Sequence, residues 1–183
     1  MEEIPTLTLL SAADYSLDDK GRISLPADFR HRVSHGGLGP FVVTYGAGRS
    51  LSVFSTKEWE AVLHDLQIPP ESEDGEDEDY EDYLRWVMTG TSFLMADAQG
   101  RVRIPANLLE HAGLTGTVTI FGMFNRLELW DPKELKNRFG SDPSKFKKQH
   151  SKTLRSSTYK TIGARTGSRL QTSDGMAPPP AEG

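Results

Sequence analysis

The sequence predicts an α+β protein, mainly β, made of two repeats that are related by a pseudo-twofold axis and flanked by helices. The phrase DDKGRISLP at residues 18–26 recurs as DAQGRVRIP at 97–105, and FVVTYGAGRSLSVFSTKEWEAV at 41–62 parallels TVTIFGMFNRLELWDPKELKNR at 117–138. Short apolar runs bounded by Gly and Asn are typical of strands. Because two copies are too few for a solenoid, we expect them to close one core together.

Each copy opens with the repeated phrase, which predicts a loop, a short strand at 23–25 or 102–104, and a short helix that starts at a proline. Proline suits the first helical position because no hydrogen bond is lost there. In the second copy, Gly113 is placed to cap the helix, and Leu114 can fold back onto it.

Two further strands are predicted in each copy, FVVTY and LSVF in the first and TVTIF and RLELW in the second. RLELW alternates polar and apolar residues, as a half-buried strand does. The copies are offset by 79 residues in the repeated phrase and by 76 beyond it. We therefore expect the first copy to carry three extra residues around SHGGLGP, at 34–40.

A helix is predicted after the last strand of each copy, because STKE at 55–58 and DPKE at 131–134 fit the capping box. The first of these helices has an apolar stripe at helical spacing, formed by Trp59, Val62, Leu63 and Leu66. Residues 71–82 carry nine carboxylates. We interpret them as the soluble start of a second amphipathic helix that ends at Gly90, since acidic residues suit a helix N-terminus and no calcium-loop spacing is present.

Charge is distributed unevenly along the chain. The net charge is −5, but without the acidic stretch it would be +4, and residues 144–171 carry eight basic residues and no acidic one. Such asymmetry leaves a nucleic-acid partner open. The polar residues 144–183 lack apolar periodicity, so we expect a mostly disordered basic tail. This tail could add phosphate contacts or dock on the acidic stretch of another protomer.

Composition excludes several classes of protein. The absence of cysteine excludes disulfides, thiolate metal sites and cysteine nucleophiles. There is no run of eighteen apolar residues, and the N-terminus is acidic, so we expect neither a membrane partner nor a signal peptide. A cytoplasmic protein is the expected result.

The repeated phrase places Asp18, Gly21 and Arg22 in one loop and Asp97, Gly100 and Arg101 in the other. We expect each glycine to allow a tight turn and each aspartate to accept backbone N–H bonds across it. The arginine then offers a forked donor for a phosphate or a guanine edge. An internal salt bridge between each aspartate and its arginine is the alternative, and the residues alone leave both readings open.

These residues carry a resemblance. SLDDKGRISLPADFR with VVTYGAGRSLSVFSTKEWEAV, then MADAQGRVRIPANLLEHAGL with TIFGMFNRLELWDP, resembles the MraZ family of bacterial transcriptional regulators over about residues 12–138. The resemblance implies tandem SpoVT-AbrB domains that form a double-split, swapped-hairpin β-barrel. It also implies a ring-shaped homo-oligomer that binds double-stranded DNA at direct repeats in a promoter. Such proteins usually repress their own division and cell-wall operon and associate with the nucleoid.

The expected organisation follows from the resemblance and the elements. Residues 12–55 form SpoVT-AbrB repeat 1, 56–90 a helix, the acidic linker and an inter-repeat helix, 91–133 SpoVT-AbrB repeat 2, 134–143 the end of the C-terminal helix, and 144–183 the tail. The expected structural turn residues are Asp18, Gly21, Asp97 and Gly100. The expected DNA-binding residues are Lys20, Arg22, Arg30, Arg101 and Arg103.

The first copy has the fuller basic set, because Leu109 stands where the family has an arginine and where the first copy keeps Arg30. We therefore expect Arg101 to be more structural than Arg22.

We expect no enzyme, cofactor, metal or small-molecule substrate. His31 and His35 have metal-compatible spacing but lack a third ligand, and YGAGR at 45–49 lacks the lysine and the βαβ context of a phosphate loop. The remaining alternative to DNA binding is an oligomeric protein-interaction scaffold whose arginine loops are structural.

Overall fold

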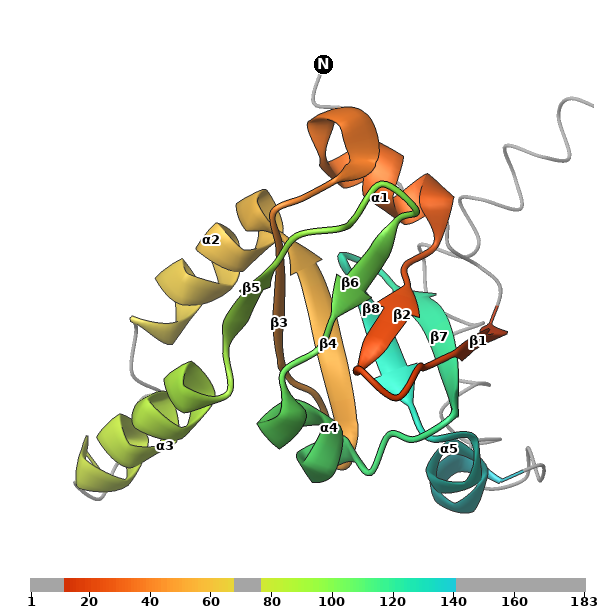
Figure 1. Ribbon diagram of the computed structural model, residues 1–183. Helices are drawn as coiled ribbons and strands as arrows, with labels where there is room; N and C mark the ends of the chain where they lie inside the picture. Colours follow the sequence, from red (N-terminus) through yellow and green to blue (C-terminus); the bar gives the residue numbers. More distant parts are fainter. Residues whose placement is uncertain (1–11, 68–76, 141–183) are drawn as a thin grey trace, which may run out of the picture. The chain divides into compact units, whose positions relative to one another are not determined.

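The computed structural model describes residues 12–67 and 77–140 (Figure 1). The chain divides into two compact units, Met1–Arg138 and Phe139–Gly183, and the fold below is that of the first. The first repeat contributes β1 (Ala13–Ser16), β2 (Arg22–Ser24), α1 (Ala27–Val33), the 3-10 turn η1 (His35–Gly37), β3 (Phe41–Tyr45), β4 (Ser50–Ser55) and α2 (Thr56–Leu66). After α3 (Asp77–Thr89), the second contributes β5 (Ser92–Leu94), β6 (Arg101–Arg103), α4 (Ala106–Ala112), β7 (Thr117–Met123), β8 (Arg126–Trp130) and α5 (Pro132–Phe139).

The predicted α+β class is confirmed, and all strand pairs are antiparallel. Six strands form one sheet in the order β1-β7-β8-β4-β3-β5, and β2 pairs with β6 in a separate ribbon. When each strand is replaced by its equivalent in the other repeat, the same order results, read from the opposite edge of the sheet. The expected closed barrel stays a prediction, since the strands pair in these two separate ladders.

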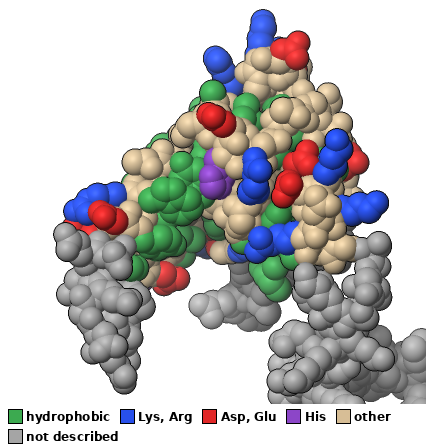
Figure 2. Space-filling view, turned by 90° about the horizontal axis from the view of Figure 1, so that it is seen from below, with side chains coloured by type: hydrophobic (Ala, Val, Ile, Leu, Met, Phe, Trp, Pro, Cys, Tyr) green, Lys and Arg blue, Asp and Glu red, His purple; other side chains and the backbone are tan. Residues whose placement is uncertain are grey.

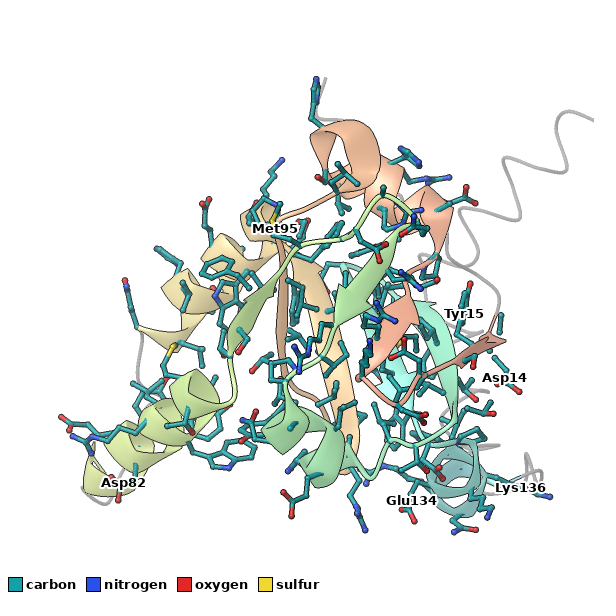
Figure 3. The ribbon with its side chains drawn as sticks, in the orientation of Figure 1. Asp14, Tyr15, Asp82, Met95, Glu134 and Lys136 are labelled. Atoms are coloured by element: carbon teal, nitrogen blue, oxygen red, sulfur yellow. The ribbon has the colours of Figure 1, made fainter. Side chains whose placement is uncertain are left out.

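The repeats interlock, because the first strand of each pairs with the third strand of the other. β1 pairs with β7, and β5 pairs with β3. The Thr119 hydroxyl strengthens the first exchange by donating to Asp14 Oδ1 over 2.7 Å, at the sheet edge seen in Figure 3. Ser52 faces its repeat equivalent Glu128, and Ile23 faces its equivalent Val102, so the pseudo-twofold axis passes through both pairs.

The main core lies between the β2–β6 ribbon and the six-stranded sheet. Ile23 and Val102 point inward from the ribbon, and Leu51 and Leu127 face them from the sheet. The core also holds the equivalent residues Phe29 of α1 and Leu108 of α4, both with no exposed surface. Burying such a side chain contributes about 1.5–3 kcal/mol. The inward side chains therefore fix which face of the ribbon points to solvent.

A second cluster joins α2 and α3 to the sheet. It comprises Val42, Phe54, Trp59 and Val87, with Val62, Leu63 and Leu66 packed against it. The predicted stripe of the first amphipathic helix is thus confirmed. The predicted second helix is confirmed as α3, which ends one residue before Gly90.

Aromatic packing also anchors the C-terminal half of α3. Trp86 stacks on Tyr45 with ring centroids 4.3 Å apart, and His111 of α4 lies 4.4 Å from the same tyrosine. Figure 2 shows hydrophobic side chains adjoining a histidine on the face seen from below. α3 and α4 therefore meet at Tyr45.

The position of the extra residues in the first copy differs from the prediction. Phe54 pairs with Val42, while its equivalent Trp130 pairs with Thr119, so β3 and β7 are offset by 77 residues. Only two of the three extra residues therefore precede β3, and the third lies in the β3–β4 turn. The correspondence of residues 41–62 with 117–138 was therefore wrong by one residue in β3, because it assumed that the β3–β4 and β7–β8 turns have equal length.

Helix ends mostly follow the expectations. Gly113 caps α4 with φ 63°, and the Leu114 N–H donates to the Leu109 carbonyl over 3.0 Å. The prolines, however, precede the first helical residue and do not occupy it: Pro26 and Pro105 are the N-cap residues. Their carbonyls accept the first hydrogen bonds of each helix, from the N–H of Arg30 to Pro26 and from the N–H of Leu109 to Pro105, each over 3.1 Å.

The two predicted caps are present. Ser55 Oγ accepts the N–H of Glu58 over 3.1 Å, and Asp131 Oδ1 accepts the N–H of Glu134 over 3.0 Å. In a complete capping box, the Glu58 carboxylate would also accept the backbone N–H of Ser55. Here that carboxylate instead accepts a hydrogen bond from the Asn125 side-chain amide over 3.2 Å.

The prediction of a half-buried β8 was wrong, since Glu128 is buried. Its carboxylate accepts from Arg126 over 2.8 Å and from the Trp130 indole over 3.0 Å. Charge pairing thus allows a glutamate where alternation predicted an exposed residue. The expected tail at 144–183 and the start of the acidic stretch lie outside the described residues.

Candidate nucleic-acid interface

The first copy of the repeated phrase forms a tight turn built around Asp18. The Gly21 N–H donates to the Asp18 carbonyl over 2.9 Å, and Gly21 has φ 71°, which favours glycine. Asp18 Oδ1 accepts the N–H groups of Lys20 and Arg22, each over 2.9 Å. One carboxylate oxygen therefore holds the backbone of the whole loop.

The other oxygen of Asp18 holds the arginine side chain. Arg22 Nε donates to Asp18 Oδ2 over 2.8 Å, and Arg22 Nη2 lies 2.7 Å from the same atom. The Arg22 and Asp18 side chains remain 34% and 37% exposed. The guanidinium is thus positioned by the loop while part of it still faces solvent.

The second copy repeats this geometry. Asp97 Oδ1 accepts the N–H groups of Gln99 over 3.0 Å and of Arg101 over 2.9 Å. Arg101 Nε and Nη2 lie 2.9 and 2.8 Å from Asp97 Oδ2, and Gly100 has φ 79°. Arg101 Nη2 also donates to Gln99 Oε1 over 3.3 Å. The two arginines are therefore held alike.

Backbone hydrogen bonds also change the ionisation of the two aspartates. The N–H of Arg22 is the main cause that lowers the pKa of Asp18, and the N–H of Arg101 does the same for the pKa of Asp97. Surface ion pairs of this kind contribute little to stability. Their clearest effect is geometric, because each carboxylate fixes the direction of one guanidinium.

The β2–β6 ribbon brings the two loops onto one surface. Arg22 lies opposite Arg103, and Ser24 lies opposite Arg101, while the central pair points into the core. Because side chains alternate along a strand, the outer face of the ribbon carries Arg22, Ser24, Arg101 and Arg103. Like charges directly opposite are unfavourable in an antiparallel pair, and a bound anion would offset that cost.

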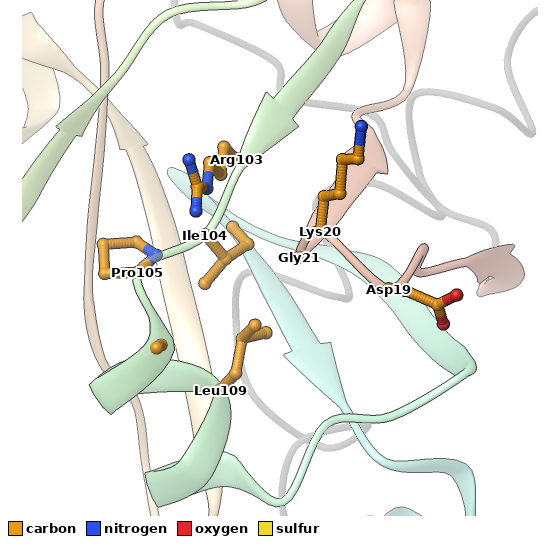
Figure 4. Close-up of a pocket in the computed structure, with 8 residues that line it drawn as sticks. Asp19, Lys20, Gly21, Arg103, Ile104, Pro105 and Leu109 are labelled. Carbon is orange, nitrogen blue, oxygen red and sulfur yellow. The ribbon is translucent and has the colours of Figure 1, made fainter.

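Lys20 and Arg103 border an open pocket of about 400 Å³ at one end of the ribbon (Figure 4). Gly21, Pro105 and Leu109 also line it. The Ile104 N–H donates to the Gly21 carbonyl over 2.9 Å, which joins the first loop to the end of β6. Arg103 of the second repeat therefore lies beside the loop of the first repeat.

Arg30 is placed differently from the other predicted DNA-binding residues. Its Nε donates to the Leu25 carbonyl over 3.1 Å, and its Nη1 donates to the Gly37 carbonyl over 2.9 Å. Its guanidinium also packs against Gly100. The equivalent position in the second repeat is Leu109, whose side chain packs against Gly21. Arg30 thus ties Leu25, which directly follows β2, to η1, and two of its three guanidinium nitrogens donate to backbone carbonyls.

Sequence reasoning missed Ser24 and Gln99 as parts of this surface. The signal was present, since Ser24 aligns with Arg103 and Gln99 aligns with Lys20 in the two copies of the phrase. Among residues 12–67 and 77–140, no three His, Asp or Glu side chains form a group that could hold a metal ion. In the same part of the chain, no helix has the length and apolar character needed to cross a membrane.

Comparison with known proteins identifies relatives over most of this fold. The family model described as "MraZ protein, putative antitoxin-like" matches residues 8–81 and 87–156. A protein of Micrococcus luteus named Transcriptional regulator MraZ is 39% identical over 115 residues, which cover 63% of this chain and 75% of that protein. A protein of the same name from Alkaliphilus oremlandii is 35% identical over 130 residues, covering 70% of this chain and 84% of that protein.

Proposed function

Because the chain belongs to the MraZ family, we propose that it is a transcriptional regulator that binds specific DNA sequences through the outer face of the β2–β6 ribbon. The observation that carries this proposal is the set of three arginines on that face, two of which are aimed by aspartates. A pre-positioned guanidinium suits a phosphate or a guanine edge.

The like-charged pair of Arg22 and Arg103 supports an anionic partner. Two cations opposite each other repel in the free protein, and phosphates of a duplex relieve that repulsion. A two-stranded ribbon also fits the major groove of B-DNA. Since each phosphate contact adds a salt-dependent increment of affinity, the few cations of one ribbon give weak binding.

Assembly would overcome this weakness. We propose that several copies form a ring, presenting ribbons at regular spacing to repeated boxes in a promoter. In this proposal the exchanged strands form the family's swapped-hairpin barrel, and the protein represses its own division and cell-wall operon at the nucleoid. The proposal is consistent with an acidic net charge, because only the repeated ribbon faces need to be basic.

The test is a binding measurement with a labelled duplex taken from upstream of the protein's own gene. We expect Arg22→Ala to weaken binding about tenfold or more, since a hydrogen bond from a charged donor is worth about 1.5–3 kcal/mol. The matched control is Arg85→Ala on α3, which removes the same charge from a residue paired with Glu81 and Asp82. Equal affinities of wild type, Arg22→Ala and Arg85→Ala would refute the proposal.

One observation favours a second candidate, a protein-interaction scaffold. Both loop arginines are already paired within the chain, so they could serve only to brace the turns. In that case Arg22→Ala would lower the stability of the loop and leave binding of the upstream duplex unchanged. Sedimentation of the Arg22→Ala and Arg85→Ala variants would show whether the oligomeric state depends on Arg22.

A further inference from the structure

The two ends of the β2–β6 ribbon differ in charge although their loops have the same geometry. Repeat equivalence relates Lys20 to Gln99, and Arg103 to Ser24. Antiparallel pairing places each loop beside the far end of the other repeat's strand. One end therefore gathers both Lys20 and Arg103, and the other gathers both Gln99 and Ser24.

At the first end, Lys20 and Arg103 add two positive charges whose side chains are not oriented by an ion pair. Both Lys20 and Arg103 are exposed, and neither forms an ion pair with another described residue. Figure 4 shows Asp19, the nearby acid, pointing away from both side chains. Exposed cations of this kind neutralise phosphates, and phosphate contacts fix position without reading sequence.

At the second end, Gln99 and Ser24 are neutral, and the Arg101 guanidinium is held in one orientation by hydrogen bonds. Arg101 is held by Asp97 and also donates to the Gln99 amide oxygen, so the two side chains are ordered together. The backbone N–H of Gln99 is itself held by Asp97. A glutamine pairs with adenine and an arginine with guanine in the major groove, whereas a neutral glutamine adds nothing to phosphate neutralisation.

Resting on the proposed DNA contact, we propose that the two ends of the ribbon contact different parts of the DNA. The end with Lys20 and Arg103 holds the DNA backbone, and the end with Gln99 and Arg101 reads base edges. This proposal replaces the expectation that Arg101 is the more structural of the two loop arginines, because Arg101 is ordered together with Gln99. Gln99 is then a specificity-determining residue. Each chain would lie on DNA in one direction, with its charged end and its reading end fixed.

The pseudo-symmetry supplies matched variants for the test, because Lys20→Gln and Gln99→Lys each convert one loop toward the other, and Gln99→Ala removes the amide without adding charge. Fluorescence anisotropy over a salt series would compare a labelled duplex from upstream of the gene with a scrambled duplex of equal composition. Unfolding midpoints would confirm that all three variants fold.

We expect Lys20→Gln to weaken binding to both duplexes by the same factor and to reduce the salt slope by about 0.9. We expect Gln99→Ala to lower the preference for the upstream duplex about tenfold at an unchanged salt slope. Gln99→Lys should raise affinity for the scrambled duplex and also lose the preference.

Two failures are distinguishable. If the wild-type protein binds both duplexes equally, the proposed sequence-specific function fails. If the wild type discriminates but both Gln99 variants keep its preference, or Lys20→Gln loses it, the proposed difference between the two ends is refuted.

Discussion

Replacing Gly100 with alanine would test whether Arg30 is a structural residue. Gly100 has φ 79°, where an L residue costs about 1–2 kcal/mol. A Cβ at this position would also overlap the Arg30 guanidinium, at 2.5 Å from its Cζ. Arg30 would have to give up a hydrogen bond to the Leu25 or Gly37 carbonyl, which is worth about 1.5–3 kcal/mol for a charged donor. We therefore expect Gly100→Ala to cost about 2.5–5 kcal/mol.

The matched control is Gly116→Ala. Gly116 has φ 60°, and a Cβ there would meet nothing within 4 Å, so only the backbone cost of about 1–2 kcal/mol applies. Urea unfolding followed by tryptophan fluorescence gives both free energies. In an Arg30→Ala background, Gly100→Ala should cost no more than the control. If Gly100→Ala and Gly116→Ala destabilise the wild-type background equally, the reasoning about Arg30 is wrong.

The remaining predictions concern the core and the loops. Leu108→Ala should lower the free energy of unfolding by about 2–5 kcal/mol, because the Leu108 side chain has no exposed surface. The control Leu38→Ala, at a position that is 44% exposed, should lower it by less than about 1 kcal/mol. Thermal unfolding of the two variants compares these costs. The pKa values of Asp18 and Asp97 are lowered from 3.8, so their contribution to stability is complete above that pH and is lost as the pH falls through the lower folded values. In an NMR titration, the amide resonances of Arg22 and Arg101 should therefore shift with midpoints below pH 3.8. A midpoint above pH 3.8 would contradict the hydrogen bonds from these amides to Asp18 and Asp97.

The sequence was a good guide to whatever is local. The loop of Asp18, the cap at Gly113 and the stripe of α2 each depend on residues a few positions apart, and each is present. The expected division into repeats at 12–55 and 91–133 stays a prediction.

Long-range relations were not accessible in the same way. The position of Arg103 beside Lys20 depends on which strand β6 pairs with, and no local pattern encodes a partner strand whose central residue, Ile23, lies 79 residues from Val102. The burial of Glu128 likewise depends on Arg126 and Trp130 satisfying its carboxylate. Repeat alignment gave the correct elements, while pairing between repeats decided which side chains share a surface.

The loss of symmetry within the duplication bears on the kind of DNA site that the protein would recognise. A ribbon with identical ends has a true twofold axis and would match a palindrome, as symmetric dimers do. Here the axis through Ile23 and Val102 relates a lysine to a glutamine and a serine to an arginine, so the ribbon has a direction. Copies joined head to tail keep that direction from one to the next. A directional ribbon in such an assembly would read direct repeats with the same polarity, so inverting one box of a pair should weaken binding more than scrambling its flanks.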